Sequence, residues 1–202
     1  MTQKTDDTAT PIRYISMSAE PAALGLFGLA TAAFVIGSGY LGWTSGDDKI
    51  LMVPWILFFG ATAQIIAGMI EFKRNNVFGA TVFSTYAMAM FAIAFTLLFT
   101  IFGGVSFDIT HYAFGLMAIL AVSLIVTVAS LMTNKVFFCI LLVVDIALAG
   151  LIPHYLNSTS SFIGGIFLLA TSVLSFYGAL SILINTMAGK TMLPLGSAIW
   201  KP

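Results

Sequence analysis

The stretch NNVFGATVFSTYAMAMFAIAFTLLFTIFGGVSF, residues 75–107, contains no Asp, Glu, Lys or Arg. A helix that crosses a bilayer needs about 20 apolar residues, so this stretch is long enough for one membrane span and part of a loop. Residues 21–46 and 50–70 are also free of charge, and residues 136–189 contain a single formal charge, Asp145. The pattern along the chain therefore predicts a protein that crosses a membrane several times.

The composition supports the same interpretation. The chain has 202 residues, of which 59% are hydrophobic and 8% are charged, whereas about 25% are charged in a typical soluble domain. So few charges cannot cover a water-soluble surface, which excludes a soluble enzyme, a nucleic-acid binder and a disordered chain. The eight basic and eight acidic residues cancel, so we expect no partner that is attracted by net charge.

Turn-forming clusters divide the longer apolar runs, at residues 102–104 and 153–158. We predict an all-α membrane protein with six transmembrane helices, near residues 21–43, 50–71, 77–101, 111–132, 135–155 and 160–187. Strands are not expected, because nothing alternates between apolar and polar residues over the length of a barrel strand. Residues 1–19 should form a flexible tail, residues 20–188 the six-helix domain and residues 189–202 a second tail.

The basic residues predict the orientation. Cytoplasmic segments of membrane proteins are enriched in Lys and Arg. With the N-terminus inside, Lys49 is the one basic residue outside, and the others lie inside: Lys4, Arg13, Lys73, Arg74, Lys135, Lys190 and Lys201. We therefore expect both termini in the cytoplasm. No signal-peptide pattern opens the sequence, so the first helix should direct its own insertion.

Asp145 is the most informative residue. It lies about ten residues into the fifth span, roughly 15 Å from the cytoplasmic end. A charge at that depth costs several kcal/mol unless it is neutralised, paired or hydrated, and no Lys or Arg lies within a span. Asp145 is therefore either a site in a solute or proton pathway or a protonated side chain that holds two helices together.

Several other residues fall at a similar depth, about 10–15 Å from the cytoplasmic edge. They are Leu29, Gln64, Tyr86 and Leu142. Depth alone leaves the direction of each side chain open. Tyr86 could equally be a core aromatic and Gln64 a hydrogen-bond donor between helices. Hydroxyl groups such as that of Ser175 add further neutral donors.

The sequence contains no pattern typical of an enzyme or of a cofactor site. His111 and His154 lie at outer helix ends and are far apart in sequence, and Cys139 is the single cysteine. No phosphate-binding loop, nucleophile–base arrangement or metal-ligand spacing is visible. We expect no metal, no cofactor and no enzymatic activity.

Three stretches resemble a known family. They are EPAALGL from Glu20 to Leu26, FFGATAQIIAGMIEFKRNNVFGATVFSTY from Phe58 to Tyr86, and GKTMLPLG from Gly189 to Gly196. Together they are similar to the acetate uptake transporter family, which includes the bacterial succinate–acetate permeases. The resemblance covers nearly all of residues 20–196.

The resemblance implies a protein of the prokaryotic plasma membrane that carries acetate, and in some members succinate or other short carboxylates. It further implies six-helix protomers assembled as homo-hexamers in the lipid bilayer, with one pathway in each protomer. An apolar constriction of that pathway aligns with Leu29, Tyr86 and Leu142. Leu29 replaces an aromatic residue of the family, so the constriction should be wider or softer.

The first motif departs from the family at Glu20, where the family has Asn, and at Ala23, where it has a second Pro. A carboxylate suits a helix N-terminus and Pro21 suits its first position. Glu20 is thus either a helix cap or, with Pro21, part of the pathway entrance, where a charged carboxylate would repel an anion.

These residues support one main hypothesis. Acetate passes the ring of Leu29, Tyr86 and Leu142 with hydrogen bonds from Tyr86 and Gln64, either as the anion or with a proton supplied near Asp145. The alternative is a sensing, scaffold or ammonium-related membrane protein that transports no carboxylate.

Overall fold

The computed structural model describes residues 18–44, 46–103 and 108–201, and these residues form helices and connecting turns without a β-strand. Six helical segments are long and apolar enough to cross a membrane, which confirms the predicted all-α class and the number of spans. The helices are α1 (Ala22–Tyr40), α2 (Val53–Trp55), α3 (Gln64–Lys73), α4 (Val77–Phe102), α5 (Tyr112–Ser130), α6 (Lys135–Asn157) and α7 (Phe162–Ala188). Shorter helical segments are η1 (Gly46–Met52), η2 (Ile56–Ala63) and η3 (Ile109–His111).

Polar side chains and one glycine fix several helix ends. The Asn76 side chain accepts a hydrogen bond from the Gly79 N–H at 3.2 Å and begins α4. Asn134 accepts from the Phe137 N–H at 3.0 Å and begins α6. Such caps satisfy backbone donors that a helix leaves unpaired at its first turn. Gly189 ends α7 with a φ of 63°, a left-handed conformation that favours glycine.

The second span is irregular, although the sequence predicts a plain helix there. It combines η1, α2, η2 and α3 over residues 46–73, and η2 is π-helical. The Thr62 hydroxyl donates to the Leu57 carbonyl five residues earlier, at 2.8 Å. The Gln64 amide donates to the Gly60 carbonyl at 2.7 Å. Wide turns of this kind are common at functional sites, and no residue type in the sequence marks this one.

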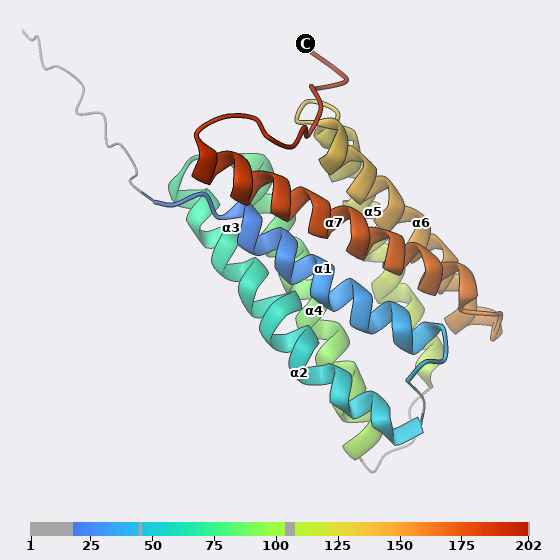
Figure 1. Ribbon diagram of the computed structural model, residues 1–202. Helices are drawn as coiled ribbons and strands as arrows, with labels where there is room; N and C mark the ends of the chain where they lie inside the picture. Colours follow the sequence, from blue (N-terminus) through green and yellow to red (C-terminus); the bar gives the residue numbers. More distant parts are fainter. Residues whose placement is uncertain (1–17, 45, 104–107, 202) are drawn as a thin grey trace, which may run out of the picture.

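Helix α1 lies inside the bundle, between α7 on one side and η2 and α3 on the other (Figure 1). Small residues allow this close approach. A Cβ atom added at Gly28 would lie 2.4 Å from the Phe59 carbonyl oxygen, and one added at Gly37 would lie 3.0 Å from the Gly165 carbonyl oxygen. The backbones of α1, η2 and α7 therefore touch almost directly.

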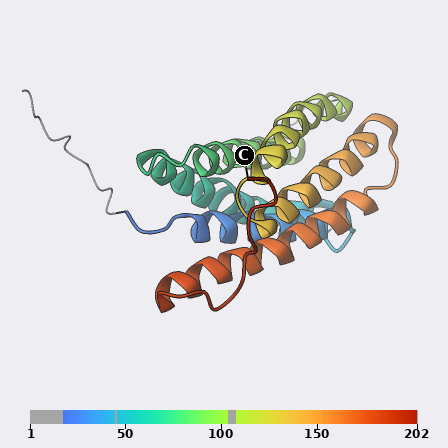
Figure 2. The same ribbon diagram turned by 90° about the horizontal axis from the view of Figure 1, so that it is seen from above.

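The two ends of the bundle differ. We call the end that carries the α3–α4 turn, the α5–α6 turn and residues 189–201 the terminal end, and the opposite end the far end. The C-terminal segment folds back over the terminal end, from the end of α7 toward the α5–α6 turn (Figures 1 and 2). The Ile199 and Trp200 N–H groups both donate to the Leu131 carbonyl at 2.9 Å. The predicted flexible tail at residues 1–19 lies, except for Ser18 and Ala19, outside the described residues.

Asn185 anchors the same segment. Its side chain accepts from the Met192 N–H at 2.7 Å and the Leu193 N–H at 2.9 Å, and donates to the Leu193 carbonyl at 2.8 Å. The Tyr177 hydroxyl donates to the Pro194 carbonyl at 2.7 Å. Residues 192–200 are thus an ordered strap across the bundle end.

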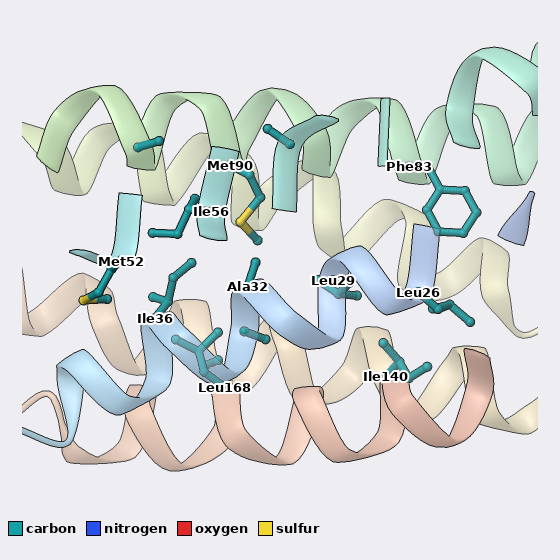
Figure 3. Packing of buried hydrophobic residues seen from close by; sticks show 14 of the residues in the cluster. Leu26, Leu29, Ala32, Ile36, Met52, Ile56, Phe83, Met90, Ile140 and Leu168 are labelled. Carbon is teal, nitrogen blue, oxygen red and sulfur yellow. The ribbon is translucent and has the colours of Figure 1, made fainter. Parts of the chain in front are cut away.

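The core between the helices is apolar, and Figure 3 shows its packing. Phe83 extends from α4 toward α1 and lies next to Leu26. Its ring fills the space above Gly25, where an added Cβ would lie 2.4 Å from Cε1 of the ring. A glycine at position 25 is therefore required by the aromatic ring that faces it.

Candidate functional site

A cavity of about 170 Å³ lies in the middle of the bundle, and we call it the central cavity. Leu29 of α1, Tyr86 of α4 and Val144 of α6 line it. Its other lining residues are almost all apolar: Ala33, Ile36, Tyr40, Ala89, Met90, Ala92, Ile93, Tyr112, Gly115, Leu116, Ile119, Leu148, Leu151, Leu168 and Thr171. A space with these walls suits a small solute that has an apolar part and few polar atoms.

The central cavity leads toward the far end. A second space of about 70 Å³, the far-end cavity, shares Tyr40 and Tyr112 with it and also contacts Lys49. A third space of about 230 Å³ is lined by residues that include Thr96, Asp108 and Tyr112. Tyr112 therefore lines all three of these spaces.

At the terminal end lies a larger space of about 360 Å³, the vestibule. Glu20, Glu71 and Asn185 line it, together with Ala22, Asn76, Phe78, Gly79, Phe83, Thr133, Asn134, Phe137, Ile182, Thr186 and Leu195. Leu195 belongs to the C-terminal strap, so the strap forms part of the vestibule wall.

Phe83 separates the vestibule from the central cavity. It lines the vestibule, whereas Tyr86, three residues further along α4, lines the central cavity. The two spaces share no lining residue. The Phe83 side chain is 2% exposed and is held against α1 at Gly25. The vestibule and the central cavity are therefore separate spaces in this structure.

Asp145 is buried in a hydrogen-bond network that joins three helices. Ser123 and Thr127 of α5 both donate to its carboxyl group, Thr127 at 2.7 Å. The Tyr86 hydroxyl of α4 lies 2.5 Å from the Ser123 hydroxyl. Asp145 is 5% exposed and does not itself line any of the four spaces described above. It reaches the central cavity through Ser123 and Tyr86.

The structure corrects one predicted constriction residue. Leu142 is 41% exposed on the outer side of α6 and does not line the central cavity, which is lined by Val144 instead. An α-helix turns by about 100° per residue, so positions two apart point in nearly opposite directions. The Leu142 side chain therefore points away from the cavity wall that Leu29 and Tyr86 share.

Gln64 and Ser175 are fully buried between helices, and neither lines the central cavity. The Gln64 Oε1 atom and the Ser175 Oγ atom have no hydrogen-bond partner within the described ranges. Of the predicted pathway residues, the structure places Leu29 and Tyr86 on the wall of one cavity and leaves Gln64 and Ser175 within the helix packing.

Glu20 lies at the start of α1 and on the wall of the vestibule. One carboxylate oxygen accepts the Ala22 N–H at 3.3 Å, and the other pairs with Arg74 at 2.7 Å. The Arg74 guanidinium also donates to the Ala19 carbonyl at 3.2 Å. Glu20 thus caps α1 and lines the vestibule as one half of an ion pair, next to the buried Pro21.

Sequence reasoning missed Val144, Ser123, Thr127 and Phe83. A signal existed for two of them, because Ser123 and Thr127 are one turn apart in an otherwise apolar span and must share a helix face. Val144 and Phe83 carry no such signal, since each is one apolar residue among many in an apolar span. In the described ranges, no group of three His, Cys, Asp or Glu residues is arranged to hold a metal ion.

Comparison with known proteins identifies the family. A model described as the GPR1/FUN34/yaaH family matches residues 5–195. The chain belongs to this family. The match confirms the resemblance inferred from the three sequence motifs and, with the six apolar spans, shows a multi-pass membrane protein.

Individual relatives match either a short part of the chain or the whole chain at low sequence identity. The succinate-acetate/proton symporter SatP of Escherichia coli K12 is 38% identical over 68 residues, which cover 34% of this chain and 35% of that protein. The aligned segment thus spans about a third of this relative. Acetate permease A of Emericella nidulans is 26% identical over 205 residues, covering 91% of this chain and 68% of that protein.

A solved structure confirms the fold. It is described as the bacterial acetate channel SatP and superimposes with a TM-score of 0.81 at 23% identity. The match covers 89% of this chain and 99% of the solved one. The six-helix arrangement found here is therefore the arrangement of that protein.

Proposed function

We propose that this protein is a plasma-membrane permease that carries acetate and other short carboxylates through each protomer without converting them chemically. The observation that carries the proposal is the series of spaces along one protomer, with an apolar central cavity lined by Leu29, Tyr86 and Val144. The names of two relatives, a succinate-acetate/proton symporter and an acetate permease, support the same substrate class.

The central cavity suits acetate because the ion has one methyl group and one carboxylate. Leu29 and Val144 offer apolar contact to the methyl group, and Tyr86 adds a residue with a hydroxyl group to the same wall. Stripping water from an anion in an apolar space costs many kcal/mol. A hydrogen-bond donor at Tyr86 would offset part of that cost without holding the ion tightly.

The network behind Tyr86 can control whether this donor is available. When Asp145 is ionised, Ser123 donates to the carboxylate, so Tyr86 must donate to Ser123. The Tyr86 hydroxyl then offers only its lone pairs to the cavity. When Asp145 is protonated, it can donate to Ser123, which donates to Tyr86, and the phenolic proton turns toward the cavity. Protonation of Asp145 would thus convert Tyr86 from an acceptor into a donor for the acetate anion.

This reversal gives Asp145 a role in proton-coupled transport although it lies outside the cavity. A proton on Asp145 favours the state in which Tyr86 binds a carboxylate, and the anion in turn favours the proton. The ordinary alternative, a structural link between α5 and α6, uses the same hydrogen bonds to Ser123 and Thr127. The two roles differ in their pH dependence.

Assembly as a homo-hexamer is part of the proposal and follows from the family resemblance. The outward position of Leu142 is compatible with a neighbouring protomer or with lipid on that face of α6. Native mass spectrometry of the detergent-solubilised protein would measure the number of protomers directly.

Reconstitution tests the main proposal. Proteoliposomes containing the protein should take up labelled acetate faster than protein-free liposomes, and a proton gradient that is acidic outside should increase the rate. A Tyr86→Phe variant removes only the hydroxyl group and should slow uptake. Uptake by the wild-type protein no faster than in protein-free liposomes, after native mass spectrometry has shown intact assembly, would contradict carboxylate transport and favour a sensing or scaffold role.

A further inference from the structure

The far-end cavity contains a combination of residues that the proposed pathway does not yet use. Lys49, on η1, lines this space of about 70 Å³ together with Tyr40 of α1, Tyr112 of α5 and Tyr155 of α6. Four separate segments of the chain therefore place one lysine and three tyrosines around one small space.

Lys49 is available to bind an anion. Within the residues that the structure describes, its ammonium group has no ion-pair partner. The neighbouring Asp47 and Asp48 are exposed on the same turn, and neither lines the cavity. Among the described residues that line the vestibule and the other three spaces, Lys49 is the one Lys or Arg.

The three tyrosines hold their hydroxyl groups in fixed positions. The Tyr40 and Tyr155 hydroxyls lie 2.7 Å apart, so one of them donates to the other and the second proton stays free. The Tyr112 and Tyr155 rings pack edge to face with centroids 4.8 Å apart. In the described part of the chain, the Tyr112 hydroxyl makes no hydrogen bond. Two phenolic protons are therefore free to donate.

We propose that Lys49 and this tyrosine cluster form a carboxylate-binding site at the far-end mouth of the pathway. The inference rests on the proposed function, because the ligand is the transported acid itself. Lys49 supplies the charge that attracts an anion, and the phenols of Tyr112 and of the Tyr40–Tyr155 pair donate hydrogen bonds to its oxygens. The space equals that of about two water molecules, which suits a short monocarboxylate.

The site also explains how an anion can lose its hydration water before it enters the apolar central cavity. Tyr40 and Tyr112 line both the far-end cavity and the central cavity. A carboxylate held by Lys49 can exchange water for phenol hydrogen bonds and keep one of them as it moves inward. The central cavity offers no cation, so the ion is bound weakly there and does not stay.

Uptake kinetics of labelled acetate in proteoliposomes test the site. A Lys49→Gln variant should raise the KM for acetate by about three- to tenfold with little change in maximal rate, because loss of a charge at the rim mainly weakens capture. The wild-type KM should rise with salt concentration, and that of the variant should rise less. Lys49→Arg should stay within about twofold of the wild type, since the charge is kept. Tyr112→Phe should raise KM in the same direction as Lys49→Gln.

A matched control is Lys73→Gln, because Lys73 is an exposed lysine at the opposite end of the bundle that lines none of the four spaces. It should leave KM unchanged. A KM for Lys49→Gln within twofold of the wild type, with wild-type uptake intact, would overturn the site and leave the permease proposal standing. Absence of wild-type uptake would instead overturn the permease proposal.

A second experiment tests whether the lost charge, and not a folding defect, explains the raised KM of the Lys49 variant. Lys49→Cys in a Cys139→Ala background can be treated, after reconstitution, with a membrane-impermeant thiol reagent that adds a positive or a negative group. The positive group should restore a low KM and the negative group should raise it further. Equal effects of the two reagents would contradict the role of charge at this position.

Discussion

The Tyr86 hydroxyl lies 2.5 Å from the Ser123 hydroxyl, and this contact joins the wall of the central cavity to a buried carboxyl group. Ser123 in turn contacts Asp145, which is 5% exposed. Each hydroxyl has one proton to donate, so the direction of the whole chain is set at the Asp145 end. The proton state of a residue outside the pathway can therefore change the chemistry of the pathway wall.

The first prediction concerns the hydrogen bonds that link Tyr86, Ser123 and Asp145. Ser123→Ala removes the partner of Tyr86, so its proton can point into the cavity whether or not Asp145 is protonated. A hydrogen bond to a charged group contributes about 1.5–3 kcal/mol, so we expect Ser123→Ala to take up acetate about tenfold or more faster than the wild type under conditions in which Asp145 is ionised. Labelled acetate uptake at a fixed acetate anion concentration, corrected for protein-free liposomes, measures this ratio.

The control for that variant is Ser181→Ala, because Ser181 is also buried and its hydroxyl has no partner in the described ranges. It should keep the wild-type rate of acetate uptake. If Ser123→Ala also keeps the wild-type rate, Asp145 does not act on Tyr86 and serves only to hold α5 and α6 together.

The second prediction separates Val144 from Leu142. Val144 lines the central cavity with Leu29 and Tyr86, whereas Leu142 faces outward. Val144→Ala should widen the cavity and raise lactate uptake relative to acetate by about tenfold, the scale on which apolar pockets discriminate by one or two carbon groups. Leu142→Ala should leave the ratio within about twofold. A larger effect at Leu142 than at Val144 would restore the constriction that the sequence predicted.

The contrast between Leu142 and Val144 shows what the sequence can specify. The charge pattern predicts the spans because the bilayer core excludes charges and unpaired backbone groups. Depth then follows from the rise of 1.5 Å per residue. The direction of an apolar side chain does not follow, because lipid and protein interior are equally apolar and leave no contrast between helix faces.

Prediction from sequence has the same limit for polar residues, as Asp145 shows. Its position in the fifth span predicted a carboxyl group that is neutralised, hydrogen-bonded or hydrated, and the structure shows one that accepts two hydrogen bonds. Its partners Ser123 and Thr127 could be chosen only once α5 and α6 were known to be neighbours. The irregular helix at residues 56–63 and the ordered strap at residues 192–200 depend likewise on tertiary contacts.

The third prediction concerns the barrier between the vestibule and the central cavity. Phe83→Leu shortens the side chain that separates these spaces while it keeps most of the apolar volume. If opening at this point limits the rate, as conformational steps often do, the maximal acetate uptake should rise by about threefold. Phe78→Leu is the control, because Phe78 also lines the vestibule but packs against Phe137 of α6, whereas Phe83 packs against Gly25 of α1. Equal rates for wild type, Phe83→Leu and Phe78→Leu would place the barrier elsewhere.

The fourth prediction concerns the C-terminal strap. Asn185→Ala removes three hydrogen bonds to Met192 and Leu193. Each such bond stabilises by about 1 kcal/mol, so amide hydrogen exchange at residues 192–195 should become faster by about tenfold or more. Hydrogen exchange followed by mass spectrometry measures this rate. Asn157→Ala, at the far end of α6, should leave it unchanged, and unchanged exchange in Asn185→Ala would show that Tyr177 and Leu131 hold the strap without it.

The last prediction tests the close contact of α1 with η2. An alanine Cβ at Gly28 would lie 2.4 Å from the Phe59 carbonyl oxygen, which cannot move without shifting the helix backbone. We expect Gly28→Ala to lower the free energy of unfolding by about 1–3 kcal/mol, the usual cost of overpacking. Gly115→Ala in α5 is the matched control, because no atom lies within 4 Å of its added Cβ, and alanine should stabilise the helix there by up to about 1 kcal/mol. Thermal unfolding in detergent, followed by tryptophan fluorescence, should therefore show melting temperatures that move in opposite directions. A shift of the same sign and size in both variants would mean that the α1–η2 contact is looser than the distance from Gly28 to the Phe59 carbonyl implies.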